Sequence, residues 1–450
     1  MKKTVQYIRK VLKKSFDNIR NENLKQNILQ AVPFWIGSII TGLAAVLYAQ
    51  FFAFGENLLH KILEWHLWLI FLIAPFGFVL SWWLVQKYAP FAKSSGIPQV
   101  MAAVELANPR ENKKIPKLLS FRIIIIKILS SFVLVFSGGA IGREGPTIQV
   151  AGSIFRKVYE FLPDWWPKIS KKNMILTGAA AGLSAAFNTP LGGIVFAVEE
   201  LSKIHINYFK TALFTAVIIA GLTAQSLAGS YLYLGYPKTQ DVPLQIMFPI
   251  VFVSGISGIL SSQLSVFMLK INLLKKKLKG IFSNIIFLAI CGLIVASIAY
   301  FINQDILGSG KNIMERVLFT DNKTESWYVP ILRMLGPALA FTSGGSGGIF
   351  APALSAGASL GSVFAEFMNL TESETNVLIL AGMVAFLTGI TRAPFTSAIL
   401  VLEMTDRHSL VFHLMLAGMM SSIFSVLVSK HSLYEILKEN FLKELKTTKI

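Results

Sequence analysis

Long runs without a charged residue recur along almost the whole chain, and they restrict its fold more than any other feature. A helix that crosses a bilayer needs about 20 consecutive, mostly apolar residues. Runs of this kind cover residues 31–55, 67–86, 174–198, 211–237, 242–269, 281–304, 334–365 and 409–429, and shorter ones cover 128–142, 376–391 and 393–402. The sequence therefore predicts an all-α integral membrane protein.

The composition agrees with this prediction. Only 15% of the 450 residues are charged, 54% are hydrophobic, and the mean hydropathy is +0.59. Soluble domains carry about 25% charged residues, so the chain is too poor in charge for an ordinary soluble protein. The single cysteine, Cys291, excludes an intrachain disulfide. No polar linker divides the apolar runs, so we expect one membrane domain over residues 31–434.

The net charge of +18 raises nucleic-acid binding as an alternative, but the placement of the positive residues argues against it. Short basic runs that flank apolar spans mark cytoplasmic segments. We therefore expect a multi-pass protein of the cell membrane with both termini cytoplasmic. Residues 1–30 form a basic segment too charged for a cleavable signal peptide, and 435–450 form a short tail. The basic clusters are Lys2, Lys3, Arg9, Lys10, Lys13, Lys14 and Arg20, and then Lys275, Lys276, Lys277 and Lys279.

Glycine and proline interrupt several apolar runs. Pro190 lies inside the run 174–198, and four glycines precede Pro352 in the run 334–365. Lipid cannot satisfy the polar groups of broken backbone, so such segments must be buried in protein or line a cavity. Isolated glycines more often only allow close helix packing. The dense group before Pro352 instead predicts partly re-entrant helices, which are typical of transporter and channel cores.

The two halves of the chain share one pattern, which predicts repeats over roughly 31–235 and 242–434. Ser-Gly-Gly, a proline and Ala-Gly follow one another in 137–152 and again in 343–357. Further on, Glu199 comes nine residues after Pro190, and Glu403 comes nine residues after Pro394. The offset between copies is about 205 residues throughout. This shared order and spacing argues against chance similarity and is typical of transporters with their site at the repeat interface.

Three segments, 95–98, 142–146 and 347–352, each place glycine and then proline before an apolar stretch. Proline suits the first turn of a helix, so each segment predicts a helix N-terminus, which is a ready site for an anion. Each also has a structural interpretation. Ser95 can simply cap its own helix, Arg143 and Glu144 can form a surface ion pair, and 347–352 can be a re-entrant turn.

The order of these motifs resembles the CLC family of chloride channels and proton-coupled chloride transporters. Residues 94–98 (SSGIP) are similar to the family's GSGIP, 142–146 match GREGP, and 348–352 (GIFAP) match GxFxP. Residues 432–434 are similar to the segment that carries an anion-coordinating tyrosine. Ser94 departs from the usual glycine but leaves Ser95 in place. The resemblance runs from about residue 31 to Tyr434, and no regulatory cytoplasmic domain follows, which favours a prokaryotic-type exchanger.

The resemblance implies a homodimer in which each subunit has its own pore, with two inverted repeats and many tilted helices. It implies that the hydroxyls of Ser95 and Tyr434 and the backbone N–H groups of Ile349 and Phe350 bind chloride. Ser95 fits chloride-preferring members rather than nitrate or fluoride transporters. The motif residues expected to support the site are Gly96, Pro98, Gly142, Arg143, Gly145, Pro146, Gly348 and Pro352.

Two glutamates are candidates for proton transfer. Glu144 is an ionisable residue in an apolar setting, which marks it as functional, and the resemblance makes it the external gate. Glu200 lies at the end of an apolar stretch with Lys203 beyond it, which by itself indicates a solvated helix end. The resemblance instead matches Glu200 to the internal proton-transfer glutamate of exchangers, where family channels have an apolar residue. We therefore expect chloride/proton antiport, with a passive chloride channel as the alternative.

An enzyme is not expected. Residues 344–348 fit the G-x-S-x-G pattern of hydrolases, but that motif needs a strand–turn–helix setting and a base. Residues 308–311 resemble part of a phosphate-binding loop, but Asn312 stands where Ser or Thr is required. The sequence contains no metal-ligand cluster and no nucleotide motif. We therefore expect no cofactor, and transport driven by ion gradients alone.

Overall fold

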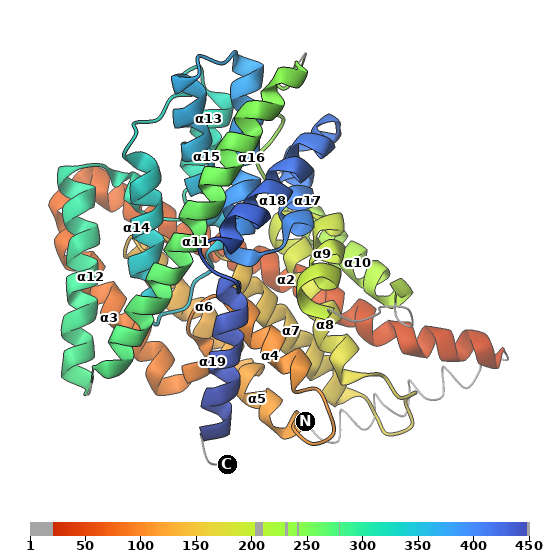
Figure 1. The fold of residues 1–450 in the computed structure, drawn as a ribbon. Helices are drawn as coiled ribbons and strands as arrows, with labels where there is room; N and C mark the ends of the chain where they lie inside the picture. The colour runs from red at the N-terminus through yellow and green to blue at the C-terminus, as the bar shows by residue number, and fades with distance from the viewer. Residues whose placement is uncertain (1–20, 203–209, 230–232, 241–242, 279, 448–450) are drawn as a thin grey trace.

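The computed structural model describes residues 21–202, 210–229, 233–240, 243–278 and 280–447, and almost all of them are helical (Figure 1). In the first half lie α2 (Glu22–Trp65), α3 (Ile70–Tyr88), α4 (Ile97–Glu105), α5 (Ile115–Leu118), α6 (Phe121–Phe136), α7 (Glu144–Phe161), α8 (Lys171–Phe187), α9 (Pro190–Phe196) and α10 (Lys210–Ala228). In the second half lie α11 (Met247–Lys277), α12 (Ile281–Phe301), α13 (Lys311–Phe319), α14 (Val329–Thr342), α15 (Phe350–Phe367), α16 (Glu372–Thr391), α17 (Pro394–Thr405), α18 (Val411–Val426) and α19 (Leu433–Thr447). The predicted all-α class is confirmed.

Short helical turns join these elements. They are η1 (Leu67–Leu69), η2 (Pro90–Ala92), η3 (Asn112–Lys114), the π-helical turn η4 (Ala197–Ser202), η5 (Leu244–Ile246), η6 (Gln304–Ile306) and η7 (His408–Leu410). Of these, η4 has a direct bearing on the candidate site because it continues α9 and contains Glu200.

Eight of the described helical stretches are long and apolar enough to cross a bilayer. Two predicted runs are divided instead: 174–198 into α8 and α9, and 334–365 into α14 and α15. Two runs predicted to be short belong to longer spans, because 128–142 continues a stretch that begins at Asn112 and 376–391 lies within the 20-residue α16. The divisions fall at the glycine and proline groups, where the helical hydrogen-bond pattern cannot continue.

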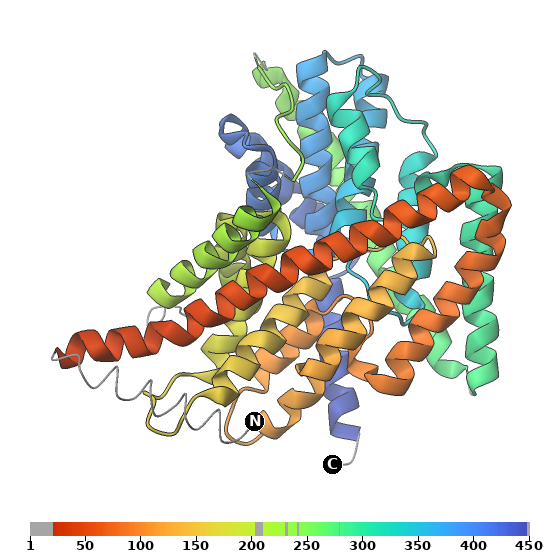
Figure 2. The same cartoon turned by 180° about the vertical axis from the view of Figure 1, so that it is seen from behind.

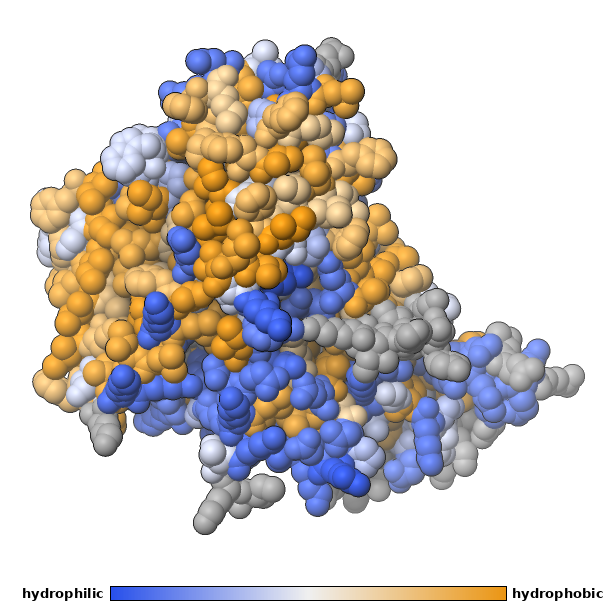
Figure 3. Space-filling view, in the orientation of Figure 1, coloured by the Kyte–Doolittle hydropathy of each residue, from blue (hydrophilic) through white to orange (hydrophobic). Residues whose placement is uncertain are grey.

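The helices are strongly tilted against one another. Figure 2 shows α2 crossing the molecule obliquely, and its 44 residues would extend about 66 Å, well beyond the ~30 Å hydrocarbon core of a bilayer. Apolar side chains cover the flank formed by α11 and α12, whereas hydrophilic residues gather at the end of the molecule around α19 (Figure 3). A wide apolar flank with a polar end is the surface expected of a protein that spans a membrane.

Two helices form the centre of the fold and correspond between the halves. Almost every side chain of α16 is buried, against α15, α11 and α18, and α8 is buried in the same way against α7 and α10. Each ends in a left-handed residue, Asn188 at φ 58° and Arg392 at φ 64°, two positions before a proline that starts the next helix. The matching helix order follows the repeat found in the sequence.

The C-terminal segment differs from the expected tail. Residues 435–447 continue α19, which packs against α4 through Leu437, Phe441, Leu442 and Leu445. These apolar residues recur at helical spacing, and the burial of this face holds the helix on the protein. Of the expected basic segment 1–30, residues 1–20 lie outside the described residues, and α2 already begins at Glu22.

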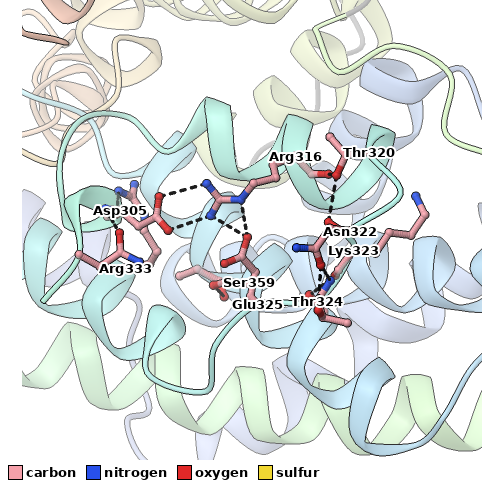
Figure 4. A network of polar contacts seen from close by, with 12 residues as sticks. Asp305, Arg316, Thr320, Asn322, Lys323, Thr324, Glu325, Arg333 and Ser359 are labelled. Carbon is pink, nitrogen blue, oxygen red and sulfur yellow. Dashed lines mark hydrogen bonds and ion pairs between the residues drawn. The ribbon is translucent and has the colours of Figure 1, made fainter. Parts of the chain in front are cut away.

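A polar network in the second half of the chain joins η6, α13, α14 and α15 (Figure 4). Arg316 donates to Asp305 and to Glu325, in both cases at 2.8 Å. The guanidinium of Arg333, which is fully buried, donates to Ser355 Oγ on α15 at 2.9 Å and to the carbonyls of residues 305, 307 and 308. Burial raises the pKa of Glu325 and the neighbouring Arg316 opposes that rise. The network thereby fixes α15, whose N-terminus belongs to the candidate site.

Close packing of α15 and α16 gives a test of the fold. A Cβ atom on Gly357 would overlap the carbonyl oxygen of Gly382, whereas one on the repeat counterpart Gly152 would lie 3.5 Å from its nearest neighbour. We expect Gly357→Ala to destabilise the protein by about 1–3 kcal/mol, as overpacking does, and Gly152→Ala to have little effect. Thermal unfolding of the detergent-solubilised variants measures both, and equal midpoints would contradict the packing.

Candidate anion-binding site

Three helices begin at the same place in the interior, and their preceding loops are bonded to one another. Gly142 and Gly348 exchange two backbone hydrogen bonds of 2.8 and 2.7 Å, which join the loop before α7 to the loop before α15. Ser94 N–H donates to Gly345 O at 2.8 Å, which joins the loop before α4 to the same loop before α15. The N-termini of α4, α7 and α15 are therefore held together although they lie about 50 and 200 residues apart in sequence.

Glycine and proline make this approach possible. Gly96 has φ 110°, a conformation that side-chain-bearing residues rarely adopt, and a Cβ on it would lie 2.8 Å from Gly145 O. A Cβ on Gly348 would lie 3.0 Å from Gly142 O. Pro98, Pro146 and Pro352 each lie in the first turn of their helix. Their missing N–H groups cost no hydrogen bond there.

The carboxylate of Glu144 lies between two of these helix starts. Glu144 is the first residue of α7 and is 1% exposed. Its carboxylate faces the backbone N–H of Ala351, in the first turn of α15. Helix N-termini carry a partial positive charge of about half a unit, so the carboxylate stands where two helix dipoles favour an anion.

Two hydroxyls face each other at the start of α4. Ser95 and Tyr434 are both fully buried, and Tyr434 Oη faces Ser95 Oγ. Among the described residues, neither hydroxyl has a hydrogen-bond partner of good geometry. Buried hydroxyls rarely lack a partner, so these two donors are available to a small anion placed between them.

Phenylalanine rings line the site between these hydroxyls and the outer side. Phe350, the first residue of α15, packs its ring 6.2 Å from that of Tyr434 and 6.3 Å from that of Phe187. Ile349, just before it, is also buried. Apolar side chains here exclude water, which strengthens the attraction of an anion to the surrounding dipoles. The structure thus brings Ser95, Glu144, Phe350 and Tyr434 together.

Glu199 and Glu200, adjacent in η4, have different surroundings. Glu200 is buried, with 6% of its surface exposed. It lies close enough to Tyr434 for the two side chains to interact electrostatically. The interpretation of Glu200 as part of a solvated helix end is therefore wrong. Lys203, which that interpretation placed beyond it, lies outside the described residues. Glu199 instead accepts hydrogen bonds from the N–H groups of Phe395 and Thr396 at the start of α17. A π-helical turn at this point is consistent with a functional site.

The repeat gives Glu199 a counterpart that the sequence analysis recorded without a role. Glu403, at the end of α17, accepts hydrogen bonds of 3.0 and 2.6 Å from the N–H groups of Leu191 and Gly192 at the start of α9. Each helix thus caps the other, which satisfies N–H groups that have no partner within their own helix. The identical nine-residue spacing from each proline was the signal in the sequence.

Two lysines brace the loops of the site, Lys127 from within a span and Lys275 from the basic cluster at the end of α11, and the sequence analysis gave neither of them this role. Lys127 on α6 is fully buried and donates to Ala92 O at 2.8 Å and Ser94 O at 2.7 Å. Lys275 donates to Thr342 O and Ser343 O at the end of α14. A lysine inside the apolar span 112–136 was the available signal for Lys127. Both lysines brace the loops that precede the helix starts.

A cavity of about 570 Å³ leads from the end of the molecule near α19 toward these loops. It reaches Ser94 and Gly344, and its lining includes Lys93, Lys275 and Phe441. Positive groups in a concave pocket attract anions. The cavity ends at Ser94, the residue before the fully buried Ser95.

The hydrolase pattern at 344–348 does not have the surroundings that catalysis requires. Ser346 lies in the loop between α14 and α15, with no strand before it in the described part of the chain. Its hydroxyl donates to Ala92 O at 2.6 Å, and its N–H donates to Ser130 Oγ. Ser346 therefore braces the loop.

Comparisons with known proteins identify relatives of this chain. The chain is 28% identical over 416 residues to an H(+)/Cl(-) exchange transporter, ClcA, of Citrobacter koseri, and the alignment covers 88% of this chain and 85% of the relative. The ClcA of Salmonella paratyphi B matches with the same identity and coverage.

Solved structures show the same fold. A slow cyanobacterial Cl⁻/H⁺ antiporter superposes with a TM-score of 0.80 at 23% identity, covering 93% of this chain and 99% of that one. A CLC-type fluoride/proton antiporter gives 0.75 at 19% identity with the same coverage. These likenesses confirm the predicted CLC-like fold.

The sequence profile described as "Voltage gated chloride channel" matches residues 76–426, which is most of the chain. The resemblance noted from the motifs is thereby confirmed. The protein belongs to the voltage-gated chloride channel (CLC) family.

Proposed function

We propose that this protein is a secondary active antiporter that moves chloride across the cell membrane in exchange for protons. The observation that carries this proposal is the position of the Glu144 carboxylate between the starts of α7 and α15, where an anion would bind. The relatives named H(+)/Cl(-) exchange transporters support antiport over the channel alternative.

Chloride binds, in this proposal, between the hydroxyls of Ser95 and Tyr434 and the backbone N–H groups of Ile349 and Phe350. Partial charges at helix starts suit a transported ion, because a full positive charge would hold it too tightly to release. The hydroxyls of Ser95 and Tyr434, for which the described part of the chain offers no hydrogen-bond partner of good geometry, support the assignment. The motif residues Gly96, Gly142, Gly145 and Gly348 keep the loops close enough for these donors to converge.

Protons move through Glu144 and Glu200. An ionised Glu144 is itself an anion and competes with chloride for the helix starts, whereas a protonated Glu144 loses that attraction and can move aside. Glu200 accepts the proton on the inner side, where its burial near Tyr434 supports the assignment. No step requires a nucleotide or a metal, so the two ion gradients drive transport.

The passive chloride channel is the second candidate, and it uses the same anion site without proton transfer. Family channels typically carry an apolar residue at the position of Glu200, so the glutamate favours exchange. Reversal potentials under combined chloride and proton gradients separate the two. A channel follows the chloride gradient alone, and an antiporter responds to both.

We propose further that two copies form a homodimer in which each subunit keeps its own site. Large apolar side chains are exposed on neighbouring helices α9, α10, α17 and α18, which gives a surface suited to a second copy. They are Leu191, Leu222, Phe395, Phe412 and Ile423. Both termini would be cytoplasmic, because the basic end of α11 at Lys275–Lys277 and the polar α19 lie at one end of the molecule (Figure 3).

The first test separates the two glutamates from the anion path. We expect Glu144→Gln and Glu200→Gln to abolish proton movement while chloride still moves, because an amide neither takes up nor releases a proton near neutral pH but fits the same space. Simultaneous chloride and pH electrodes on proteoliposomes measure both fluxes. Glu64→Gln, an exposed position on α2, is the control and should couple normally. Proton uptake driven by a chloride gradient in either test variant would contradict the assignment.

The second test addresses the anion ligands. A hydrogen bond to a charged group contributes about 1.5–3 kcal/mol, so we expect Tyr434→Phe to weaken chloride binding about 10- to 100-fold, as measured by calorimetry. Ser153→Ala removes a hydroxyl that bonds within α7 and should leave binding unchanged. Unchanged chloride affinity in Tyr434→Phe would remove this ligand from the proposal.

The chloride preference has its own test in the wild-type protein. Equal fluoride and chloride flux into proteoliposomes would contradict that preference.

A further inference from the structure

Tyr233 approaches the gate from the outer side, on a segment to which the sequence analysis gave no role. It lies between α10 and η5, and 4% of its surface is exposed. Its hydroxyl donates to Glu144 Oε1 at 3.4 Å. The next residue, Leu234, donates its N–H to Met404 O at 3.2 Å, which fixes this segment against α17.

The ring of Tyr233 ends a row of aromatic side chains along the anion site. It meets Phe187 edge-on with ring centres 5.1 Å apart, and Phe187 stacks on Phe350, which packs against Tyr434. The row thus carries one phenol at each end, with Tyr434 beside Ser95 and Tyr233 beside Glu144. Lys311 Nζ lies 5.3 Å from the centre of the Tyr233 ring and pairs with Glu315 at 3.2 Å.

We propose that Tyr233 is a positioning residue for the gate: its hydroxyl holds the ionised Glu144 carboxylate between the starts of α7 and α15, and Lys311 supports it through the ring. This inference rests on the proposed antiport. A hydroxyl that donates to a carboxylate favours its charged form, and a cation over an aromatic ring is attracted to it. Tyr233 therefore sets the external pH range in which Glu144 leaves the anion position.

The other charged and titratable groups around Glu144 do not replace this contact. Arg143 precedes Glu144 in the chain and interacts with its carboxylate electrostatically. Tyr48 on α2 shares a hydrogen bond of 2.6 Å with Ser131, and Tyr434 on α19 faces Ser95. Among the described residues, the Tyr233 hydroxyl is the side-chain group that donates to the carboxylate from another element, and the backbone N–H of Ala351 also faces it.

The test is Tyr233→Phe in the full chain, with chloride efflux from proteoliposomes measured against external pH. Transport needs Glu144 to leave the anion position, which protonation permits, so flux rises as the pH falls. Without the hydroxyl the charged form loses a stabilising contact, and we expect the midpoint to move by about 0.5 to 1 unit to higher pH. The proton/chloride ratio should stay unchanged. Tyr236→Phe removes an exposed hydroxyl three residues away and should not move the midpoint.

Two further variants make the result specific. In a Glu144→Gln background, Tyr233→Phe should have no effect on the pH profile because no carboxylate remains to titrate. Lys311→Met, at a partly exposed position, should move the midpoint in the same direction at low salt, and Lys311→Arg should not. Lys311→Met also tests the inference if Tyr233→Phe does not fold. An unmoved midpoint in wild-type-like folded Tyr233→Phe or in Lys311→Met would overturn the inference. Wild-type protein that moves chloride without protons would instead overturn the proposed antiport.

Discussion

The convergence of three helix starts in the interior is the constraint on which the rest of the structure depends. Helix starts leave backbone N–H groups without partners inside the helix, and lipid cannot satisfy them. The loops before α4, α7 and α15 solve part of this problem by bonding to one another through Ser94, Gly142, Gly345 and Gly348. The three helix starts that these bonds hold together are where we propose that an anion binds.

The surrounding structure keeps these loops from separating. Lys127 and Lys275 donate to loop and helix-end carbonyls from α6 and α11, and Arg333 ties α15 to the segment 305–308. The mutual caps formed by Glu199 and Glu403 join the two repeats at α9 and α17. Buried charges are costly unless each finds partners, and here the partners are the polar groups that broken helices expose. The basic side chains of Lys127, Lys275 and Arg333 and the ends of the interrupted helices therefore stabilise one another.

Much of the fold was predictable because its signals are local. Charge-free runs marked the spans, and glycine followed by proline marked the helix starts at residues 97, 144 and 350. The site residues Ser95, Glu144 and Tyr434 were predictable only through their order along the chain, since no local pattern says that residues 339 positions apart lie together. The family motifs supplied that long-range information.

What the sequence did not predict depends on tertiary contacts without a local pattern. The partner of Glu199 lies 197 residues away at Thr396. Tyr233 lies in the charge-free run 211–237, but α10 ends at Ala228, before it. The packing of α19 on α4 was missed because its apolar face alternates with lysine and glutamate, which looks like a solvated tail. In each case the residue type was ordinary, and only its neighbours in space give it a role.

The most direct measurement of the central claim is the anomalous scattering of bromide in crystals of the Glu144→Gln protein. Bromide replaces chloride and is located independently of any assumption about the site. The account predicts one bromide within hydrogen-bond reach of Ser95 and Tyr434, and a second where the Glu144 carboxylate lies between the starts of α7 and α15. A protein that binds bromide in solution but shows no peak at either place would contradict it.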